Sequence, residues 1–423
     1  MSEPTGEKHA LIPKGILFPF ILLSSCFMWW GIANNITDPL VRVFKAIFGN
    51  LSTFQASLIQ FAFYGGYFCM AVPGAIIARK YSYKVGVLVG LGLYAVGCFL
   101  LYPSTLTQQF VFFCISYYVL ACGLGILETN ANPYILAIGP ESTATRRLNF
   151  AQSFNPIGSI IGILLCQILI MARLPQVDGK IVIPPGGESD ALNIVIFPYL
   201  SVAACLVLVW ILIAVTKMPR MAEHDHRAHV GDSVRHLLAN KNYVFSVVAQ
   251  FFYVGAQITV WTYTNFYIPE HLNVSPEVTL RYHTVALVLF AASRWVFTAL
   301  MTKYKASTLL LVASVLAGVM TLSVVFVGGV VGVWSLIGIS VFMSLMFPTI
   351  FGLGCQGLGE DTKLGSSGLI MAILGGALIT PAQGALIDLV GVDLSYLLPL
   401  VCFIVIGFYS VTAGKIEKSH LTG

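Results

Sequence analysis

Charged residues are scarce in this chain. They make up 10% of its 423 residues, whereas 57% are hydrophobic. Soluble domains carry about 25% charged residues, so a surface this apolar would aggregate in water. The composition excludes a soluble enzyme or a nucleic-acid-binding protein and predicts a protein embedded in a lipid bilayer.

Motifs for metal, nucleotide or catalytic chemistry are also absent. The nine cysteines fall in apolar stretches without CxxC spacing, which is typical of buried packing residues rather than of disulfides or metal ligands. There is no Walker loop, dinucleotide fingerprint, HExxH or GxSxG motif, so we expect no enzyme, no bound metal and no cofactor.

Transport by such a chain would have to be driven by an ion gradient such as the proton gradient. The N-terminus lacks a cleavable signal peptide.

Long apolar runs are what the sequence has instead. Twelve of them are long enough to cross about 30 Å of hydrocarbon. Backbone groups inside lipid must be bonded within the segment, so each run is predicted to be a helix. The predicted spans are 16–46, 52–80, 83–103, 109–138, 146–172, 192–216, 242–269, 277–301, 306–328, 331–356, 364–389 and 394–415.

The basic residues predict the topology. Of the 23 Lys and Arg, the few outside the loops expected in the cytoplasm are Arg42, Lys45, Arg173, Lys180, Arg281 and Arg294. By the positive-inside rule, both termini are expected to be cytoplasmic. A polar linker, 217–241, then separates two six-helix halves, 16–216 and 242–415, with tails at 1–15 and 416–423. His224, His226 and His229 in the linker could hold a metal ion, but a solvated linker fits its composition better.

The two halves resemble each other in sequence. Gly139-Pro140-Glu141-Ser142-Thr143 precedes the fifth span and Gly359-Glu360-Asp361-Thr362 precedes the eleventh. Basic loops follow the second and eighth spans as well. This repeat is typical of the major facilitator plan, in which the substrate binds between the halves near the membrane midplane. We therefore predict an all-α membrane protein with the major facilitator fold, and a monomer.

Two acids lie deep inside predicted spans, Asp38 in the first and Glu128 in the fourth. A charged side chain at this depth costs about 2.5–3.5 kcal/mol on insertion scales, so it is rarely left there without a use. Desolvation disfavours the charged form, which suits a buried carboxyl to loading and releasing a proton. Pro39 removes a backbone bond beside Asp38 and loosens the helix. The alternative is a structural carboxyl paired with a nearby base such as Arg42.

Polar residues recur at helical spacing in the fifth and seventh spans. Amides bond hydroxyl groups and flat aromatics stack on the C–H face of a pyranose, so an uncharged sugar suits such faces. The alternative is that these stripes hold the helices together by hydrogen bonds, and Arg294 could equally be an anchor for backbone carbonyls. The candidate substrate-binding residues are Asn34, Asn132, Gln152, Asn155, Gln250, Tyr253, Gln257, Trp261, Asn265, Arg294 and Gln356, and the candidate proton-coupling residues are Asp38 and Glu128.

Several strings in the first half resemble the fucose:proton symporter family of the major facilitator superfamily. They are Ala33-Asn34-Asn35 with Asp38, Gln60 to Phe68, Ser82-Tyr83-Lys84, Leu127-Glu128-Thr129 with Ala131-Asn132-Pro133, Gly139-Pro140-Glu141-Ser142, and Arg147-Leu148-Asn149 with Ala151-Gln152. The resemblance implies proton-coupled sugar uptake by alternating access, with proton coupling at Asp38 and Glu128 and with Asn155 beside the central cavity. The glucose/galactose branch carries Gln at the Glu128 position, which favours the fucose branch.

Two residues depart from the family's pattern, Asn130 and Pro156, and we expect both close to the cavity, where they bear on the sugar's identity. The chain is thus expected to import L-fucose or a closely related hexose with a proton, across a bacterial inner membrane. The alternatives are a proton symporter for glucose, galactose, mannose or N-acetylglucosamine, a proton-driven exporter of hydrophobic compounds, or a sugar sensor. A sensor would need a long signalling extension, and the amides of the seventh span disfavour an exporter.

Overall fold

The chain is almost entirely helical in its computed structural model, which describes residues 11–13, 15–37, 44, 46–49, 53–177, 180–219 and 230–421. The N-terminal half comprises α1 (Leu17–Thr37), α3 (Thr53–Lys80), α4 (Tyr83–Thr107), α5 (Phe110–Ala137), η1 (Glu141–Thr143), α6 (Ala144–Gln152), α7 (Phe154–Leu165), η2 (Cys166–Met171) and α8 (Glu188–Val215). The C-terminal half comprises α10 (Lys241–Leu272), α11 (Pro276–Leu300), α12 (Ala306–Phe326), α13 (Gly329–Met343), α14 (Met346–Cys355), η3 (Gly359–Asp361), α15 (Thr362–Met371), α16 (Leu374–Val390), α17 (Val392–Ser395) and α18 (Leu397–Leu421). A short antiparallel pair, β1 (Gln176–Val177) and β2 (Lys180–Ile181), lies in the loop before α8.

Eleven helical segments of the described chain are long and apolar enough to cross a membrane, and Leu17–Ala33 adds a shorter apolar helix. The predicted spans 52–80 and 242–269 agree with α3 and α10 to within a few residues. The fifth, tenth and eleventh spans are broken into shorter helices, which hydrophobicity alone does not predict. The twelve-span helical architecture is confirmed, although the later part of the first predicted span, including Asp38, lies outside the described residues.

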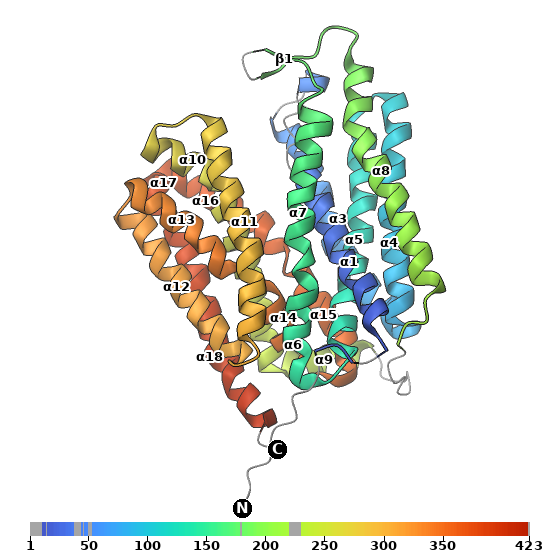
Figure 1. The fold of residues 1–423 in the computed structure, drawn as a ribbon, viewed down its shortest axis with the longest axis vertical. Coiled ribbons are helices and arrows are strands. Elements are labelled where there is room, and N and C mark those ends of the chain that lie inside the picture. Colours follow the sequence, from blue (N-terminus) through green and yellow to red (C-terminus); the bar gives the residue numbers. More distant parts are fainter. Residues whose placement is uncertain are drawn as a thin grey trace, which may run out of the picture.

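The two halves stand side by side, the N-terminal half on the right of Figure 1 and the C-terminal half on the left. We call the end where α3 meets α4 at Tyr81 and Ser82 the basal end, and the opposite end, which carries β1, the apical end. Contacts between the halves join α6 to α14 and α15 to α5, and the labels of α6, α14 and α15 lie low in Figure 1. Asn149 donates to Thr349 Oγ1 at 3.1 Å, and Ser366 Oγ donates to the carbonyl oxygen of Thr129 at 3.0 Å.

Glycines set the close packing of the N-terminal half. A Cβ atom added to Gly90 on α4 would lie 2.6 Å from the backbone nitrogen of Leu127 on α5. A Cβ atom on Gly125 would lie 3.1 Å from the Cα atom of Tyr67 on α3. Small residues let helices approach closely in lipid, where no hydrophobic force drives them together. This packing fixes the position of α5, the helix that carries Glu128.

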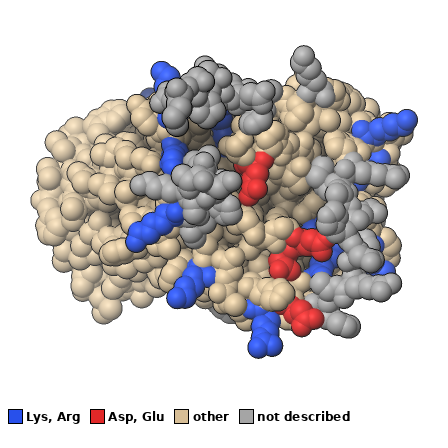
Figure 2. Space-filling model, turned by 90° about the horizontal axis from the view of Figure 1, so that it is seen from below, with Lys and Arg blue, Asp and Glu red and all other residues tan. Residues whose placement is uncertain are grey.

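The linker between the halves contains a helix that the sequence analysis did not predict, α9 (Val230–Ala239). Its Ser233 and Leu237 are buried, and Arg79 donates from Nη1 to Ser233 Oγ at 2.9 Å. The expectation of a wholly solvated linker is therefore wrong for this stretch, because α9 packs one face on the bundle. His224, His226 and His229 lie outside the described residues. Figure 2 views this basal end and shows Lys and Arg side chains distributed over it.

Candidate functional site

A small cavity lies between the two halves at the level of Glu128. We call it the central cavity; its volume is about 40 Å³. This is close to the space of a single water molecule, so a sugar could enter only after side chains or helices move. Its lining residues are Phe27, Trp30, Glu128, Gln152, Asn155, Tyr253, Gln257, Phe290, Arg294 and Phe347.

Glu128 is the acid of this cavity. It is 3% exposed, and its Oε2 atom has no hydrogen-bond partner among the described residues. No salt bridge in the described part of the chain reaches it. An uncompensated buried carboxylate is costly, so a group placed here is suited to carry a proton. The cavity thus places a potential proton carrier at the boundary between the two halves.

A short relay of amides fixes the helix that carries Glu128. Asn132 Nδ2 donates to the carbonyl oxygen of Glu128 at 3.1 Å, and Gln152 Nε2 donates to Asn132 Oδ1 at 2.7 Å. Asn132 therefore links α5 to α6 from behind the cavity, whereas Gln152 also lines it. A ligand that moves Gln152 would also act on the backbone at Glu128 through this relay.

Trp30 also lines the cavity on the N-terminal side, and Tyr67 holds it from behind. Trp30 Nε1 donates to the hydroxyl of Tyr67, which joins α1 to α3. Tyr67 is buried and interacts electrostatically with Glu128. Trp30 and Glu128 thus both line the central cavity, and Tyr67 bonds the indole nitrogen.

The C-terminal half supplies the opposite wall. Tyr253 on α10 donates its hydroxyl to the carbonyl oxygen of Met343 at 3.1 Å. Trp261 packs edge-on against Phe290 at 5.1 Å between ring centroids, and its Nε1 donates to Ser340 Oγ at 3.1 Å. The guanidinium of Arg294 lies 4.7 Å from the Phe290 centroid. Aromatic faces beside amide and guanidinium donors suit a ligand that has both C–H faces and hydroxyl groups.

The structure brings together six of the residues predicted to form the site. These are Glu128, Gln152, Asn155, Tyr253, Gln257 and Arg294.

The other predicted residues whose side chains the structure describes do not line the central cavity. Trp261 packs behind Phe290, and Gln250 is buried with neither amide atom bonded in the described chain. Asn265 is exposed, and Gln356 follows the basal end of α14. Asn34 lies on α1, but its side chain is outside the described residues, as is all of Asp38.

Four aromatic residues of the cavity were missed by the sequence analysis. They are Phe27, Trp30, Phe290 and Phe347. Phe27 and Trp30 are spaced three apart on α1, and Phe290 precedes Arg294 by one turn, so the helical period carried a usable signal. Most spans of this chain contain aromatic residues, and only the packing selects those that face inward.

Asn130 does not lie where the sequence analysis expected it. Its Nδ2 donates to the carbonyl oxygens of Gly74 at 3.2 Å and Ile126 at 2.8 Å. A Cβ atom on Gly86 would collide with its side chain. Asn130 therefore fills the junction of α3, α4 and α5, away from the central cavity. Pro156, the second departure, directly follows Asn155, which does line the cavity.

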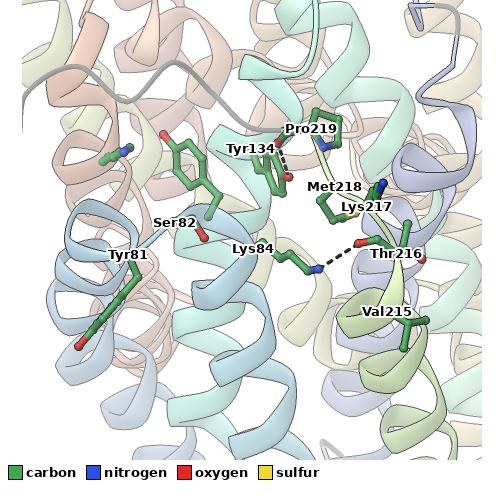
Figure 3. Close-up of a pocket in the computed structure, with 11 residues that line it drawn as sticks. Tyr81, Ser82, Lys84, Tyr134, Val215, Thr216, Lys217, Met218 and Pro219 are labelled. Atoms are coloured by element: carbon green, nitrogen blue, oxygen red, sulfur yellow. Dashed lines mark hydrogen bonds between the residues drawn. The ribbon is translucent and has the colours of Figure 1, made fainter.

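A larger cavity, of about 750 Å³, opens at the basal end beside the start of α4 (Figure 3). Lys84 Nζ donates to the carbonyl oxygens of Ala214 at 2.8 Å and Thr216 at 2.9 Å. Tyr134 donates to the carbonyl oxygen of Pro219 at 2.8 Å. These bonds tie α4 and α5 to the end of α8 and to the chain that follows it. Lys363 of the C-terminal half lines the same basal cavity, and this cavity shares no lining residue with the central cavity.

Comparisons with known proteins agree with this geometry. Residues 20–373 match the family model described as Major Facilitator Superfamily. The chain is 42% identical to an L-fucose-proton symporter of Haemophilus influenzae, over 96% of this chain and 99% of that protein. It is 32% identical to a glucose/galactose transporter of Brucella abortus, over 95% of each. The crystal structure of FucP, a Major Facilitator Superfamily transporter in the outward conformation, superposes with a TM-score of 0.86 at 36% identity, over 94% of this chain and 99% of that one.

Proposed function

This chain belongs to the Major Facilitator Superfamily, and we propose that it imports L-fucose together with a proton by alternating access. The observation that carries the proposal is the central cavity, in which the buried acid Glu128 faces amides, aromatic rings and Arg294 across the boundary of the halves. The higher identity to an L-fucose-proton symporter than to a glucose/galactose transporter supports L-fucose as the sugar. A symporter for glucose, galactose or another hexose is the alternative.

The mechanism follows from the cost of burying charge. Outside, a protonated carboxyl lets the sugar settle between the halves, and the loaded carrier rocks so that sugar and proton leave inside. An empty carrier with an ionised carboxyl reorients poorly, because a bare charge would have to be enclosed in a closed, low-dielectric core. Asp38 is the main proton carrier in this proposal, and Glu128 links protonation to sugar binding. The proton gradient is the driving force, and no cofactor takes part.

The proposed orientation places the basal end in the cytoplasm of a bacterial cell, with the chain in the inner membrane as a monomer. The Lys and Arg side chains seen over this end in Figure 2 support it, since basic residues are retained on the cytoplasmic side. The contacts between the halves through α6, α14 and α15 then close the cytoplasmic side. Their position supports an outward-facing state.

The test is the external pH of a weakly buffered, de-energised suspension of cells expressing this protein. Adding L-fucose should make the medium more alkaline, because each sugar carries a proton inward. Cells that express the Asp38→Asn protein should show no pH response. Cells that express the Glu270→Gln protein should respond like the wild type, because this substitution changes an exposed acid at the end of α10. An Asp38→Asn protein that still concentrates L-fucose would contradict the assignment of the proton carrier. If the wild-type protein responds to glucose, galactose or mannose but not to L-fucose, that hexose is the substrate in place of L-fucose.

A further inference from the structure

Arg294 is a buried cation that bonds to both halves of the molecule. It lies on α11 and is 3% exposed. Its Nε atom donates to the carbonyl oxygen of Ser344 at 2.6 Å, and its Nη1 atom donates to the carbonyl oxygen of Gln152 at 2.9 Å. Ser344 belongs to the C-terminal half and Gln152 to the N-terminal half. A single guanidinium therefore joins backbone groups that must separate if the halves rock apart at the basal end.

Both acceptors are carbonyls that a proline has left without a helical donor. In an α-helix the carbonyl of residue i accepts from the N–H of residue i+4. Pro156 stands four residues after Gln152, Pro348 stands four residues after Ser344, and proline has no N–H. The spans break at these two points, between α6 and α7 and between α13 and α14. Each half thus offers Arg294 one free carbonyl.

Aromatic rings shield these bonds. The Arg294 guanidinium lies over the ring of Phe290, and the adjacent Trp295 packs against Phe150 at 5.3 Å and Phe154 at 6.0 Å between centroids. Hydrogen bonds with a charged donor are strong, and a surrounding of low dielectric strengthens them further. A buried carbonyl that loses its donor is correspondingly unfavourable. The two carbonyls are both satisfied only while the halves stay together here.

We propose that Arg294 is a latch between the halves, held by the two carbonyls that Pro156 and Pro348 release, and that it keeps the basal side closed beneath the central cavity. Arg294 also lines that cavity. A sugar oxygen that accepts from the guanidinium competes with the Gln152 carbonyl, so loading the cavity weakens the latch. This second step rests on the proposed sugar transport, whereas the latch itself does not. Arg294 acts here as a positioning residue for the closed state.

Distances across the basal end test the latch directly. Spin labels on ketone-bearing amino acids at positions 81 and 304 leave the nine native cysteines in place; Tyr81 and Tyr304 are both 55% exposed, in basal loops of opposite halves. The full chain is measured in lipid nanodiscs without sugar. The wild type should show one short distance. Arg294→Met should raise the ratio of longer to shorter distances by about tenfold, because it removes the charge-assisted hydrogen bond to Gln152, the one of its two bonds that crosses between the halves.

Two proline variants test the same bonds with Arg294 retained. Pro156→Ala and Pro348→Ala restore an N–H that competes with Arg294 for its carbonyl, so each should raise the ratio several-fold, less than the loss of Arg294 itself. Pro198→Ala is the matched control, since Pro198 is buried within α8 and Arg294 bonds no carbonyl of that helix. It should leave the distances as in the wild type. If Arg294→Met does not fold, the two proline variants decide the question.

A wild-type distance distribution in Arg294→Met, or proline variants no different from Pro198→Ala, would overturn the latch. L-fucose exchange is followed in parallel with the same proteins in vesicles. If the wild type exchanges no L-fucose while the distances respond as expected, the proposed function fails and the latch stands. If L-fucose is exchanged and the distances do not respond, only the latch fails.

Discussion

The two halves of this molecule contribute different chemistry to one cavity. The N-terminal half brings Glu128, the one acid that is buried among the described residues, on a helix packed closely against glycine backbones. The C-terminal half brings Tyr253, Gln257, Phe290 and Arg294, and none of its described acids is buried. In a fold built from two similar six-helix units, the acid thus comes from one half alone, whereas amides and aromatic rings that suit a sugar come from both, since Gln152 and Asn155 also line the cavity.

This difference indicates where proton binding and sugar binding have to be coupled. The buried acid lies on the N-terminal wall only, so a proton there can influence groups of the C-terminal wall such as Arg294 only across the central cavity. The contacts that cross the boundary there are the Arg294–Gln152 bond and the aromatic packing of Trp295. We expect variants of the two walls to separate coupling from binding, and the following experiments test that separation.

The largest effect is expected from Glu128→Gln. The amide keeps the size of the side chain but cannot change its protonation state, so the proposed link between protonation and sugar binding is removed. Accumulation of L-fucose against its gradient should be lost and leave only equilibration. Exchange of labelled for unlabelled L-fucose across vesicles at equal pH should survive, because it needs no net proton movement. Glu270→Gln, an exposed acid of the C-terminal half, is the control and should retain accumulation. A Glu128→Gln protein that still accumulates L-fucose would show that the buried acid of the N-terminal half is not needed for coupling.

A smaller effect is expected from Gln257→Ala on the opposite wall. Losing a hydrogen bond to a sugar hydroxyl should raise the half-saturating L-fucose concentration about tenfold, with proton movement per sugar unchanged. Asn265→Ala lies two turns further along α10, where the side chain is exposed, and should change the value less than about twofold. Uptake rates over a range of sugar concentrations measure both. Equal effects of the two variants would place the whole polar stripe of α10 in the site.

The smallest effect on transport, and one mainly on stability, is expected from the glycines. Gly90→Ala should destabilise the protein by about 1–3 kcal/mol, because its Cβ atom meets the backbone of α5. Gly318→Ala in the C-terminal half should change stability by less than about 0.5 kcal/mol, since the nearest atom is the side-chain Leu400 Cδ1 at 3.5 Å. Thermal unfolding of the purified proteins in detergent compares them. Equal losses of stability in the two variants would mean that the helices of both halves tolerate an added methyl group equally well at these glycines.

Much of the fold could be predicted because membrane insertion depends on local hydrophobicity. Spans such as 52–80 and 242–269 agree with helices to within a few residues. The breaks near Ser153 and Ser344 could not be placed, since each depends on donors from another helix as well as on the following proline. The helix α9 was missed because its amphipathic face is stabilised by packing on the bundle, which includes the bond from Arg79 to Ser233.

The candidate site was predictable where a residue is unusual for its surroundings. Glu128 stood out because an acid in an apolar span is rare, and Gln152 and Gln257 because amides recur there at helical spacing. The aromatic residues Trp30 and Phe290 did not stand out, since apolar spans are full of similar rings. Asn130 was misplaced because it lies two residues after Glu128, which turns its side chain by about 200° around the helix, away from the cavity and towards α3 and α4.

The sequence by itself determined that the chain crosses a membrane many times and that an acid and two polar stripes lie inside. Those properties follow from transfer free energies that each segment has on its own. Only the tertiary structure decided which side chains share the central cavity and which carbonyls receive Arg294. Some of these contacts join residues more than a hundred positions apart, as Arg294 and Gln152 are, and their geometry exists only once the two halves have packed together.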